Sequence, residues 1–290
     1  MRVPIRALEG RWPGPLQQRA GRFFWPDPRT ILDSGADPEK FRTAMSALEV
    51  GGTYKITGSN RHPGADRLVA ENLDLTGAVI VDMGASDGST ALDFLAGLNG
   101  FGSYVLADLY LFVRHGRHRG RSYFFDQDGQ WILVVGSRTL AWPATSKLVR
   151  GLFGRGARAA AAKLDARDVL LLNPRMRRLM ERDPRVTAVV HDIFTPWPGP
   201  APDLIKVANL LRRLYFSDTQ ILAALDTLLA ALPDGGHLLV ADNSRIPGMP
   251  PRAGLYRRTG GAFEAVATTE NPPEIADLVA RAGSGRAWTG

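Results

Sequence analysis

The chain has 290 residues, of which 44% are hydrophobic and 22% are charged, so it can bury a core without disulfide or metal support. It contains no cysteine, which excludes disulfides, iron–sulfur clusters and a thiol nucleophile. No apolar run approaches the about 20 residues that span a bilayer, and the first residues lack the apolar core of a signal peptide. We therefore expect a cytoplasmic protein with no membrane partner.

Positive charge is concentrated in one segment. The whole chain carries 36 Lys and Arg against 29 Asp and Glu, a net charge of +7. Residues 111–186 hold 16 of the basic residues and 6 of the acidic ones, a local excess of 10. Such a patch attracts an anionic substrate, a nucleic acid or a membrane surface, although an Arg-rich solvated face accounts for it equally well.

Residues 1–74 are predicted to form an N-terminal arm and a helical cap. The first 30 residues are rich in Arg, Pro and Trp and show no period, which indicates an irregular arm. Residues 38–49 have Phe41, Met45 and Leu48 at helical spacing, and Gly51-Gly52 ends that helix. Residues 58–64 have loop composition, and a second helix is expected over 65–72.

From residue 75 the chain alternates between strand and helix patterns. Residues 78–81 are an apolar, β-branched run typical of a buried parallel strand. A tight turn (82–88), a helix (89–98) and a second strand (104–109) complete a βαβ unit. The pattern returns with strands at 170–172, 186–191, 203–207 and 237–241, helices at 174–182 and 217–232, and a weak strand pair at 256–258 and 263–268. The prediction is an α/β fold, a doubly wound and mostly parallel sheet with an antiparallel edge hairpin.

Residues 111–168 are predicted to be an insertion that forms a β-hairpin lid over the substrate. Two β-rich runs, 122–125 and 131–135, flank an Asp128-Gly129 turn, and residues 148–162 are rich in Gly, Ala and Arg. Aromatic rings lie close in sequence to arginines, and they either stack on an anionic substrate or form a small core beneath a basic surface. These residues are Tyr123, Phe124, Phe125 and Trp131 beside Arg114, Arg117, Arg119 and Arg121.

Polar residues follow several of the predicted strands, where ligands bind in open α/β sheets. The first loop fails the dinucleotide pattern, because Ser86 and Ser89 stand where glycines are required, and the chain has no P-loop. Asp82 and Asp87 would repel a pyrophosphate, which favours a cationic or zwitterionic ligand. Asp108 is suited to a ribose diol, since an ionised carboxylate only accepts hydrogen bonds, and Asp192 to an adenine amino group.

Four segments resemble the class I S-adenosylmethionine-dependent methyltransferases. They are 79–88 (VIVDMGASDG), 189–194 (VVHDIF), 203–211 (DLIKVANLL) and 232–240 (LPDGGHLLV). Residues 208–217 are most similar to the chemotaxis-receptor methyltransferases. The resemblance covers 75–110 and 168–243, less than half of the chain. It implies a Rossmann-like fold over 75–290, S-adenosyl-L-methionine as cofactor, and methyl transfer.

The resemblance also implies a role for each matching residue. The turn from Gly84 to Gly88 lies under the methionine part of the cofactor, and Asp82 orders that turn. Asp108 and its neighbour Leu109 meet the ribose, although residues 170–174 (LLLNP) also fit the strand-two position and would put Asn173 there instead. The complete set of implied cofactor-binding residues is Asp82, Gly84, Ala85, Ser86, Asp87, Gly88, Asp108, Leu109, Asp192, Ile193, Ala208 and Asn209.

The catalytic base and the methyl acceptor stay open. A hydroxyl acceptor requires a base, for which His191 and Tyr215 are the candidates, with His115 and His118 less suited. No metal site is expected, because these last two histidines lack carboxylate support. We expect transfer to a small anionic metabolite or natural-product precursor. The alternatives are an RNA or protein methyltransferase that docks through the basic insertion, and a non-methylating cyclase, lyase or regulatory module that binds the same cofactor. The sequence leaves open whether the chain forms a homodimer.

Overall fold

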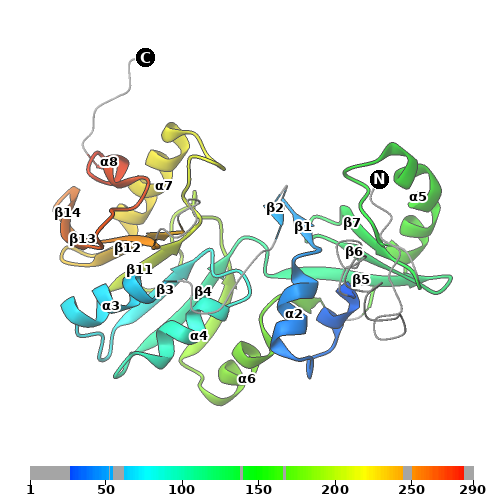
Figure 1. The fold of residues 1–290 in the computed structure, drawn as a ribbon, viewed down its shortest axis with the longest axis horizontal. Coiled ribbons are helices and arrows are strands. Elements are labelled where there is room, and N and C mark those ends of the chain that lie inside the picture. Colours follow the sequence, from blue (N-terminus) through cyan, green and yellow to red (C-terminus); the bar gives the residue numbers. More distant parts are fainter. Residues whose placement is uncertain are drawn as a thin grey trace, which may run out of the picture. The chain divides into compact units, whose positions relative to one another are not determined.

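The computed structural model describes residues 27–51, 53–54, 62–137, 140–165, 168–243 and 250–283. The chain divides into two compact units (Figure 1). Residues 1–57 and 110–177 form one, here called the antiparallel unit, and residues 58–109 and 178–290 form the other, the parallel unit. Most of the predicted arm and of the predicted loop 58–64 lies outside the described residues. The predicted cap is divided, since residues 62–72 belong to the parallel unit and residues 1–57 share a unit with the insertion.

The parallel unit contains a seven-stranded sheet in the order β10-β4-β3-β11-β12-β13-β14. The first five strands in this order are parallel, and the last two form an antiparallel edge hairpin. This confirms the predicted doubly wound, Rossmann-like sheet. The bounds are β3 (Val79–Met83), β4 (Ser103–Asp108), β10 (Val186–Val190), β11 (Leu204–Ala208), β12 (His237–Asp242), β13 (Arg252–Thr259) and β14 (Ala262–Thr268).

Helices cover both faces of this sheet, which explains why its central strands are apolar runs rather than alternating ones. Helix α7 (Asp218–Ala231) begins at a capping box of Ser217 and Gln220, and its apolar face packs on β11 and β12 together with the short α8 (Ala276–Val279). Helices α3 (Pro63–Asn72) and α4 (Ser89–Ala96) lie on the opposite face (Figure 1). Strand order reverses between β3 and β11, the topological switch point where such sheets bind ligands.

The antiparallel unit has its own five-stranded sheet, β8-β7-β6-β5-β9. Its strands are β5 (Phe112–His118), β6 (Arg121–Phe125), β7 (Trp131–Val135), β8 (Leu140–Ala141) and β9 (Val169–Leu170). The hairpin of β6 and β7 is the one predicted from the Asp-Gly turn. The remaining elements are the 3-10 helix η2 (Pro28–Leu32), α2 (Pro38–Met45), the strand pair β1 (Glu49–Val50) and β2 (Thr53–Tyr54), and α5 (Lys147–Ala161). Helix α6 (Pro174–Arg182) crosses the boundary between the two units.

Both faces of the antiparallel sheet are buried. Phe124 packs with α2 on one face, while Tyr123 and Phe125 pack with α5 on the other, because neighbouring residues of a strand point to opposite sides. All three rings are at most 3% exposed. The hypothesis that these rings stack on a substrate is therefore wrong, and the alternative of a hydrophobic core beneath a basic surface describes them. Among the helices of the described ranges, none is both long and apolar enough to cross a membrane.

Candidate functional site

The carboxyl ends of five adjacent strands bring most of the predicted cofactor-binding residues to one edge of the parallel sheet. In the order β10-β4-β3-β11-β12, each strand ends at a polar or Gly-rich segment. These segments were predicted to converge from the strand pattern alone, and the observed order brings them together. In the order of the strands they are Asp192, Asp108, the loop Gly84–Gly88, Asn209 and Asn243.

The loop after β3 is fixed by its own backbone and by the neighbouring strand. Gly84 and Ser86 have φ angles of 73° and 55°, in the left-handed region. The N–H of Gly84 donates to the carbonyl of Ala107 at 2.7 Å, and the N–H of Ser86 donates to Oδ2 of Asp108 at 2.8 Å. A Cβ on Gly84 would lie 2.8 Å from Cδ2 of Leu210, so a side chain here would force Leu210 to shift and would have to adopt a left-handed φ.

Asp82 does not face the edge of the sheet. Its carboxylate accepts a hydrogen bond from the Tyr104 hydroxyl at 2.6 Å and pairs with Nζ of Lys206 at 3.2 Å. Asp82 is 2% exposed and Lys206 is 0% exposed, and the ammonium of Lys206 lies over the Phe94 ring. The expectation that Asp82 repels a pyrophosphate is therefore wrong, because its charge is buried and paired inside the sheet. Its contacts order three strands rather than the turn itself.

Asp87 stays a candidate for opposing a phosphate, and its contacts place it at the start of α4. It is buried, and its two carboxylate oxygens accept hydrogen bonds from the N–H of Ser89 at 2.9 Å and from the Ser89 hydroxyl at 2.8 Å. Ser89 is the first residue of α4, so this carboxylate stands at the positive end of the helix where a nucleotide phosphate would bind. A dinucleotide would have to compete with a negative charge that the fold already holds there.

Asp108, not Asn173, ends the strand next to β3. Strand β4 pairs with β3 in parallel, whereas β9, which precedes Asn173, belongs to the antiparallel sheet. The Asn173 side chain accepts a hydrogen bond from the N–H of Arg175 at 2.9 Å. Leu109, the residue after β4, is exposed. The second strand of the predicted motif therefore has the Asp108 register.

The residues predicted to flank the adenine lie after β10. Oδ1 of Asp192 accepts a hydrogen bond from the N–H of Phe194 at 3.0 Å, and Ile193 is buried in the core. The neighbouring N–H of His191 donates to the carbonyl of Asp108 at 3.2 Å, which ties the end of β10 to the end of β4. Asp192 is thus held next to the strand that carries Asp108.

Asn209 follows β11 directly and has a left-handed conformation with a φ of 57°. Its N–H donates to the carbonyl of Ala241 at 2.8 Å, and its Oδ1 accepts a hydrogen bond from the N–H of Asn243 at 2.8 Å. Its Nδ2 lies 3.0 Å from Nε2 of His62, a residue that the sequence analysis missed. His62 stands 147 positions away and inside a segment of loop composition, so no local pattern indicates the contact.

The candidate bases differ in their surroundings. His191 is buried edge-on against Trp197, and burial lowers the pKa of its imidazole despite the adjacent Asp192. Tyr215 lies in the segment between β11 and α7 and is exposed. His115 and His118 lie on β5 of the antiparallel unit, where Nδ1 of His115 pairs with Asp165. Within the part of the chain that is described, no three His, Cys, Asp or Glu side chains are grouped to hold a metal ion.

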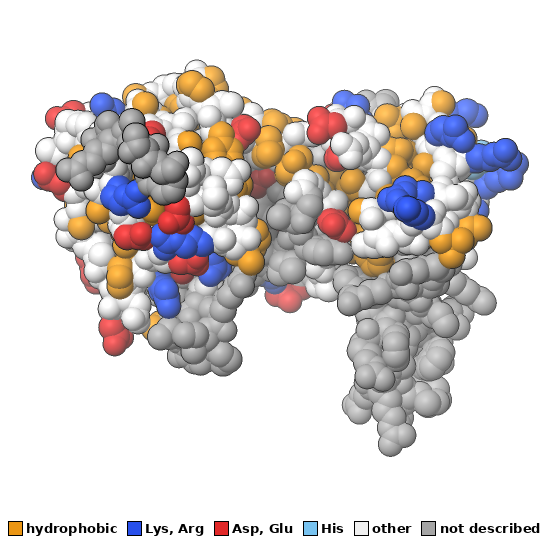
Figure 2. Space-filling view, turned by 90° about the horizontal axis from the view of Figure 1, so that it is seen from above, with side chains coloured by type: hydrophobic (Ala, Val, Ile, Leu, Met, Phe, Trp, Pro, Cys, Tyr) orange, Lys and Arg blue, Asp and Glu red, His pale blue; other side chains and the backbone are white. Residues whose placement is uncertain are grey.

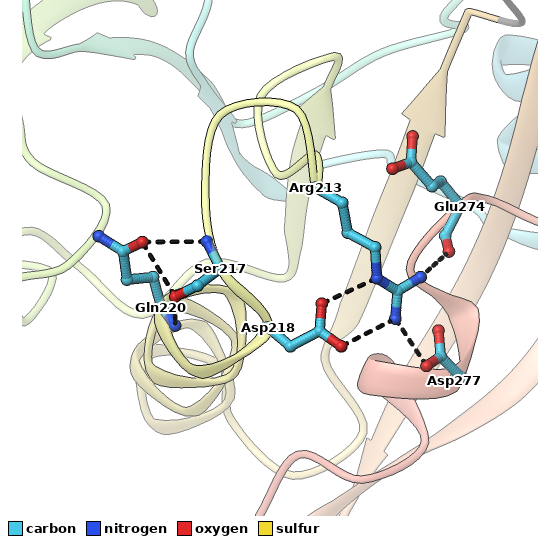
Figure 3. Close-up of polar contacts among 6 residues, drawn as sticks. All are labelled: Arg213, Ser217, Asp218, Gln220, Glu274 and Asp277. Atoms are coloured by element: carbon cyan, nitrogen blue, oxygen red, sulfur yellow. Dashed lines mark hydrogen bonds and ion pairs between the residues drawn. The ribbon is translucent and has the colours of Figure 1, made fainter.

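Arg213 holds the segment between Asn209 and α7. Arg213 donates to the carboxylates of Asp218 at 2.8 Å and Asp277 at 2.8 Å, and to the carbonyl of Glu274 at 2.8 Å (Figure 3). These acceptors raise the pKa of Arg213 above its ordinary value. Each exposed pair contributes at most about 1 kcal/mol, but together they tie this segment to both α7 and α8.

Comparisons with known proteins give distant likenesses. No protein-family model and no curated protein matches the chain. Similar solved structures include the O-methyltransferase NcsB1 from neocarzinostatin biosynthesis, in complex with S-adenosyl-L-homocysteine and 1,4-dihydroxy-2-naphthoic acid (17% identity, 60% of this chain and 34% of that chain, TM-score 0.33). They also include the N-methyltransferase NodS from Bradyrhizobium japonicum WM9 (15%, 62% and 59%, 0.33) and CalS10, an amino pentose methyltransferase from Micromonospora echinaspora (16%, 69% and 63%, 0.30).

The chain spans 34% to 59% of the length of the first three solved chains that it matches. The three proteins described are methyltransferases. At such TM-scores the likeness carries no conclusion about activity, and the assignment below rests on this chain's own residues.

Replacement of Ser86 by Gly should stabilise the chain. A non-glycine residue in the left-handed region costs roughly 1–2 kcal/mol, and glycine removes that cost while keeping the N–H that binds Asp108. We expect the free energy of unfolding of Ser86→Gly to rise by about 1 kcal/mol in denaturant titrations. The matched variant Ser86→Ala keeps the strain and should not gain stability. An equal gain in both variants would show that φ at this position is not strained.

Asp66 on α3 gives the parallel unit a pH-dependent stability. Burial, with smaller contributions from Asp82 and Asp93, raises the pKa of Asp66 from 3.8 to about 6, against the opposing effect of Lys206. Its Oδ1 is buried without a hydrogen-bond partner among the residues described. The folded chain binds the Asp66 proton more tightly than the unfolded chain does. The contribution of this group to the free energy of unfolding is therefore most favourable below about pH 4, and it is lost as the pH rises to about 6.

Replacement of Asp66 by Asn should therefore raise the melting temperature at pH 7.5 and change it little at pH 4. At pH 7.5 we expect the free energy of unfolding to increase by about 1–3 kcal/mol, because the side chain is only partly desolvated. Thermal unfolding of both proteins across this pH range measures it. If the melting temperatures of the two proteins differed by the same amount at both pH values, the raised pKa of Asp66 would be contradicted.

Proposed function

We propose that the chain is an S-adenosyl-L-methionine-dependent methyltransferase. The observation that carries the proposal is the hydrogen bond from the N–H of Ser86 to the carboxylate of Asp108, beside the switch point of a doubly wound sheet. This hydrogen bond joins the loop of segment 79–88, the first of the four segments that resemble the family, to Asp108 at the end of the adjacent strand β4. The four segments that resemble the family lie in the order in which this fold requires them.

The residues at this edge fit the cofactor. Gly84, Ser86 and Gly88 all have left-handed φ angles, which lets the backbone turn tightly, and this turn would lie under the methionine part. Asp108 accepts the N–H of Ser86 at Oδ2, and a carboxylate has about four lone-pair sites, so it is suited to accept hydrogen bonds from ribose hydroxyls. Asp87 opposes a phosphate at α4, so an adenosyl sulfonium suits the site better than a dinucleotide.

The cofactor supplies a methyl group that the sulfonium already activates. The contribution of the chain is then to orient the acceptor, which by itself can account for a large part of the rate. A carboxylate, a thioether or a free amine needs no base. His191 and Tyr215 stay the candidate bases for a hydroxyl acceptor, and Ala208 and Asn209 would line the floor near the sulfonium.

We further propose a small anionic metabolite or natural-product precursor as the acceptor. The support is electrostatic: Figure 2 displays Lys and Arg side chains gathered on the antiparallel unit. Helix α5 contains no acidic residue and exposes Lys147, Arg150, Arg155 and Arg158. Burial of Tyr123, Phe124 and Phe125 removes the rings on which single-stranded RNA would have stacked, which favours a small acceptor over RNA.

Replacement of Asp108 by Ala should weaken cofactor binding by about 10- to 100-fold, since hydrogen bonds to a charged acceptor contribute roughly 1.5–3 kcal/mol. Calorimetric titration with S-adenosyl-L-methionine measures the effect. Asn173→Ala is the matched control, because Asn173 lies after β9 of the other sheet, and it should bind like the parent. A normal affinity in Asp108→Ala with a weakened Asn173→Ala would overturn the site assignment.

The reaction itself is tested by product analysis. Mass spectrometry should detect S-adenosyl-L-homocysteine when small carboxylic and phenolic acids are supplied together with the cofactor. Methylthioadenosine formed from the cofactor alone would identify a cyclase or lyase and refute methyl transfer. Methylation of RNA but of no small acid, with a binding constant that falls steeply with salt, would instead identify a nucleic-acid substrate.

A further inference from the structure

His62 is a buried side chain at the functional edge of the parallel unit. It precedes α3, is 2% exposed, and places Nε2 3.0 Å from Nδ2 of Asn209. A second contact identifies the two ends of the Asn209 amide, because its oxygen accepts a hydrogen bond from the backbone N–H of Asn243, which can only donate. The group that faces His62 is therefore the NH₂ of Asn209.

This geometry determines the protonation state of the imidazole. An amide NH₂ only donates, so Nε2 of His62 has to accept, which requires a neutral ring with its proton on Nδ1. His62 thus acts as a hydrogen-bond acceptor, and its rigid ring sets the distance of Nε2 from the backbone. Neither an apolar side chain nor one with a shorter polar group can supply that acceptor at the same point.

Asn209 depends on such contacts because its backbone is strained. A left-handed φ of 57° at a non-glycine residue persists where several contacts together hold it. Here the Ala241 carbonyl binds the backbone N–H, the Asn243 N–H binds the side-chain oxygen, and His62 binds the side-chain nitrogen. Without His62 the amide is held only at its oxygen, by the N–H of Asn243, so its plane can turn about that single contact.

We propose that His62 is a positioning residue that orients the amide of Asn209 at the floor of the cofactor site. It acts through Asn209 and does not itself touch the reacting atoms. This inference rests on the proposed function, since it takes the edge beside Asn209 as the site of S-adenosyl-L-methionine. It adds a residue from the segment before α3 to a site otherwise made by residues after the strands.

Three variants of His62 test the acceptor. His62→Gln places an amide oxygen at about the reach of Nε2, His62→Asn places one a bond shorter, and His62→Leu removes it. Calorimetry with S-adenosyl-L-methionine should give a dissociation constant within about threefold of the parent for Gln and raised about tenfold for Asn and Leu. If the Leu variant does not fold, the Asn and Gln pair still decides. Equal affinity in Asn and Gln overturns the proposal.

A double-mutant cycle separates positioning from a general structural role. In an Asn209→Ala background, loss of the His62 acceptor should have no further effect on cofactor affinity, because its partner is gone. Equal losses in both backgrounds would mean that His62 acts independently of Asn209 and would overturn the inference. A parent chain that gives no heat with the cofactor overturns the proposed function instead. Circular dichroism and melting temperature, recorded for each variant, confirm that the proteins compared are folded.

Discussion

The buried ion pair between Asp82 and Lys206 governs the centre of the parallel sheet. These two residues lie on β3 and β11, the strands on either side of the switch point, and the Tyr104 hydroxyl on β4 completes the contact. Two charges taken out of water are tolerated only in good geometry with further hydrogen bonds, and loss of one partner typically costs about 3–5 kcal/mol. The three strands are thereby held in one register.

The candidate site is built directly on that register. Because β3, β4 and β11 are aligned, the loop after β3 reaches the carboxylate of Asp108, and Leu210 closes against Gly84. The same alignment brings Asn209 to the end of β12, where Ala241 and Asn243 hold it. The buried pair of Asp82 and Lys206 therefore orders polar groups at the sheet edge with which it has no direct contact.

Sequence patterns predicted the parallel sheet well, because its signals are local. Apolar runs followed by Gly, Asp or Asn identify β3, β10 and β11, and Ser217 caps α7 where expected. Strand β5 was missed, since Arg and His interrupt its apolar pattern. Cofactor residues were predicted as neighbours from strand order, and their roles toward a ligand stay predictions.

What the sequence did not reveal are contacts between distant segments. Lys206 lies in an apolar run and carries no local sign of its pairing with Asp82, 124 positions away. His62 likewise meets Asn209 only through the fold. Whether the aromatic rings at 123–125 are buried could not be predicted, because the alternation of side chains along a strand does not show whether one face of a hairpin or both are covered. In the structure α2 and α5 cover both faces.

The division of the antiparallel unit between two stretches of chain limits how the protein can be shortened. A truncation at residue 74 would discard α2, and with it one whole side of the hydrophobic core that Phe124 and Leu133 share. The same cut would remove α3 and the histidine before it from the parallel unit. Conversely, excision of residues 111–168 would leave α2 with its apolar face uncovered. Neither stretch is a detachable module, and fusion or deletion variants should keep both.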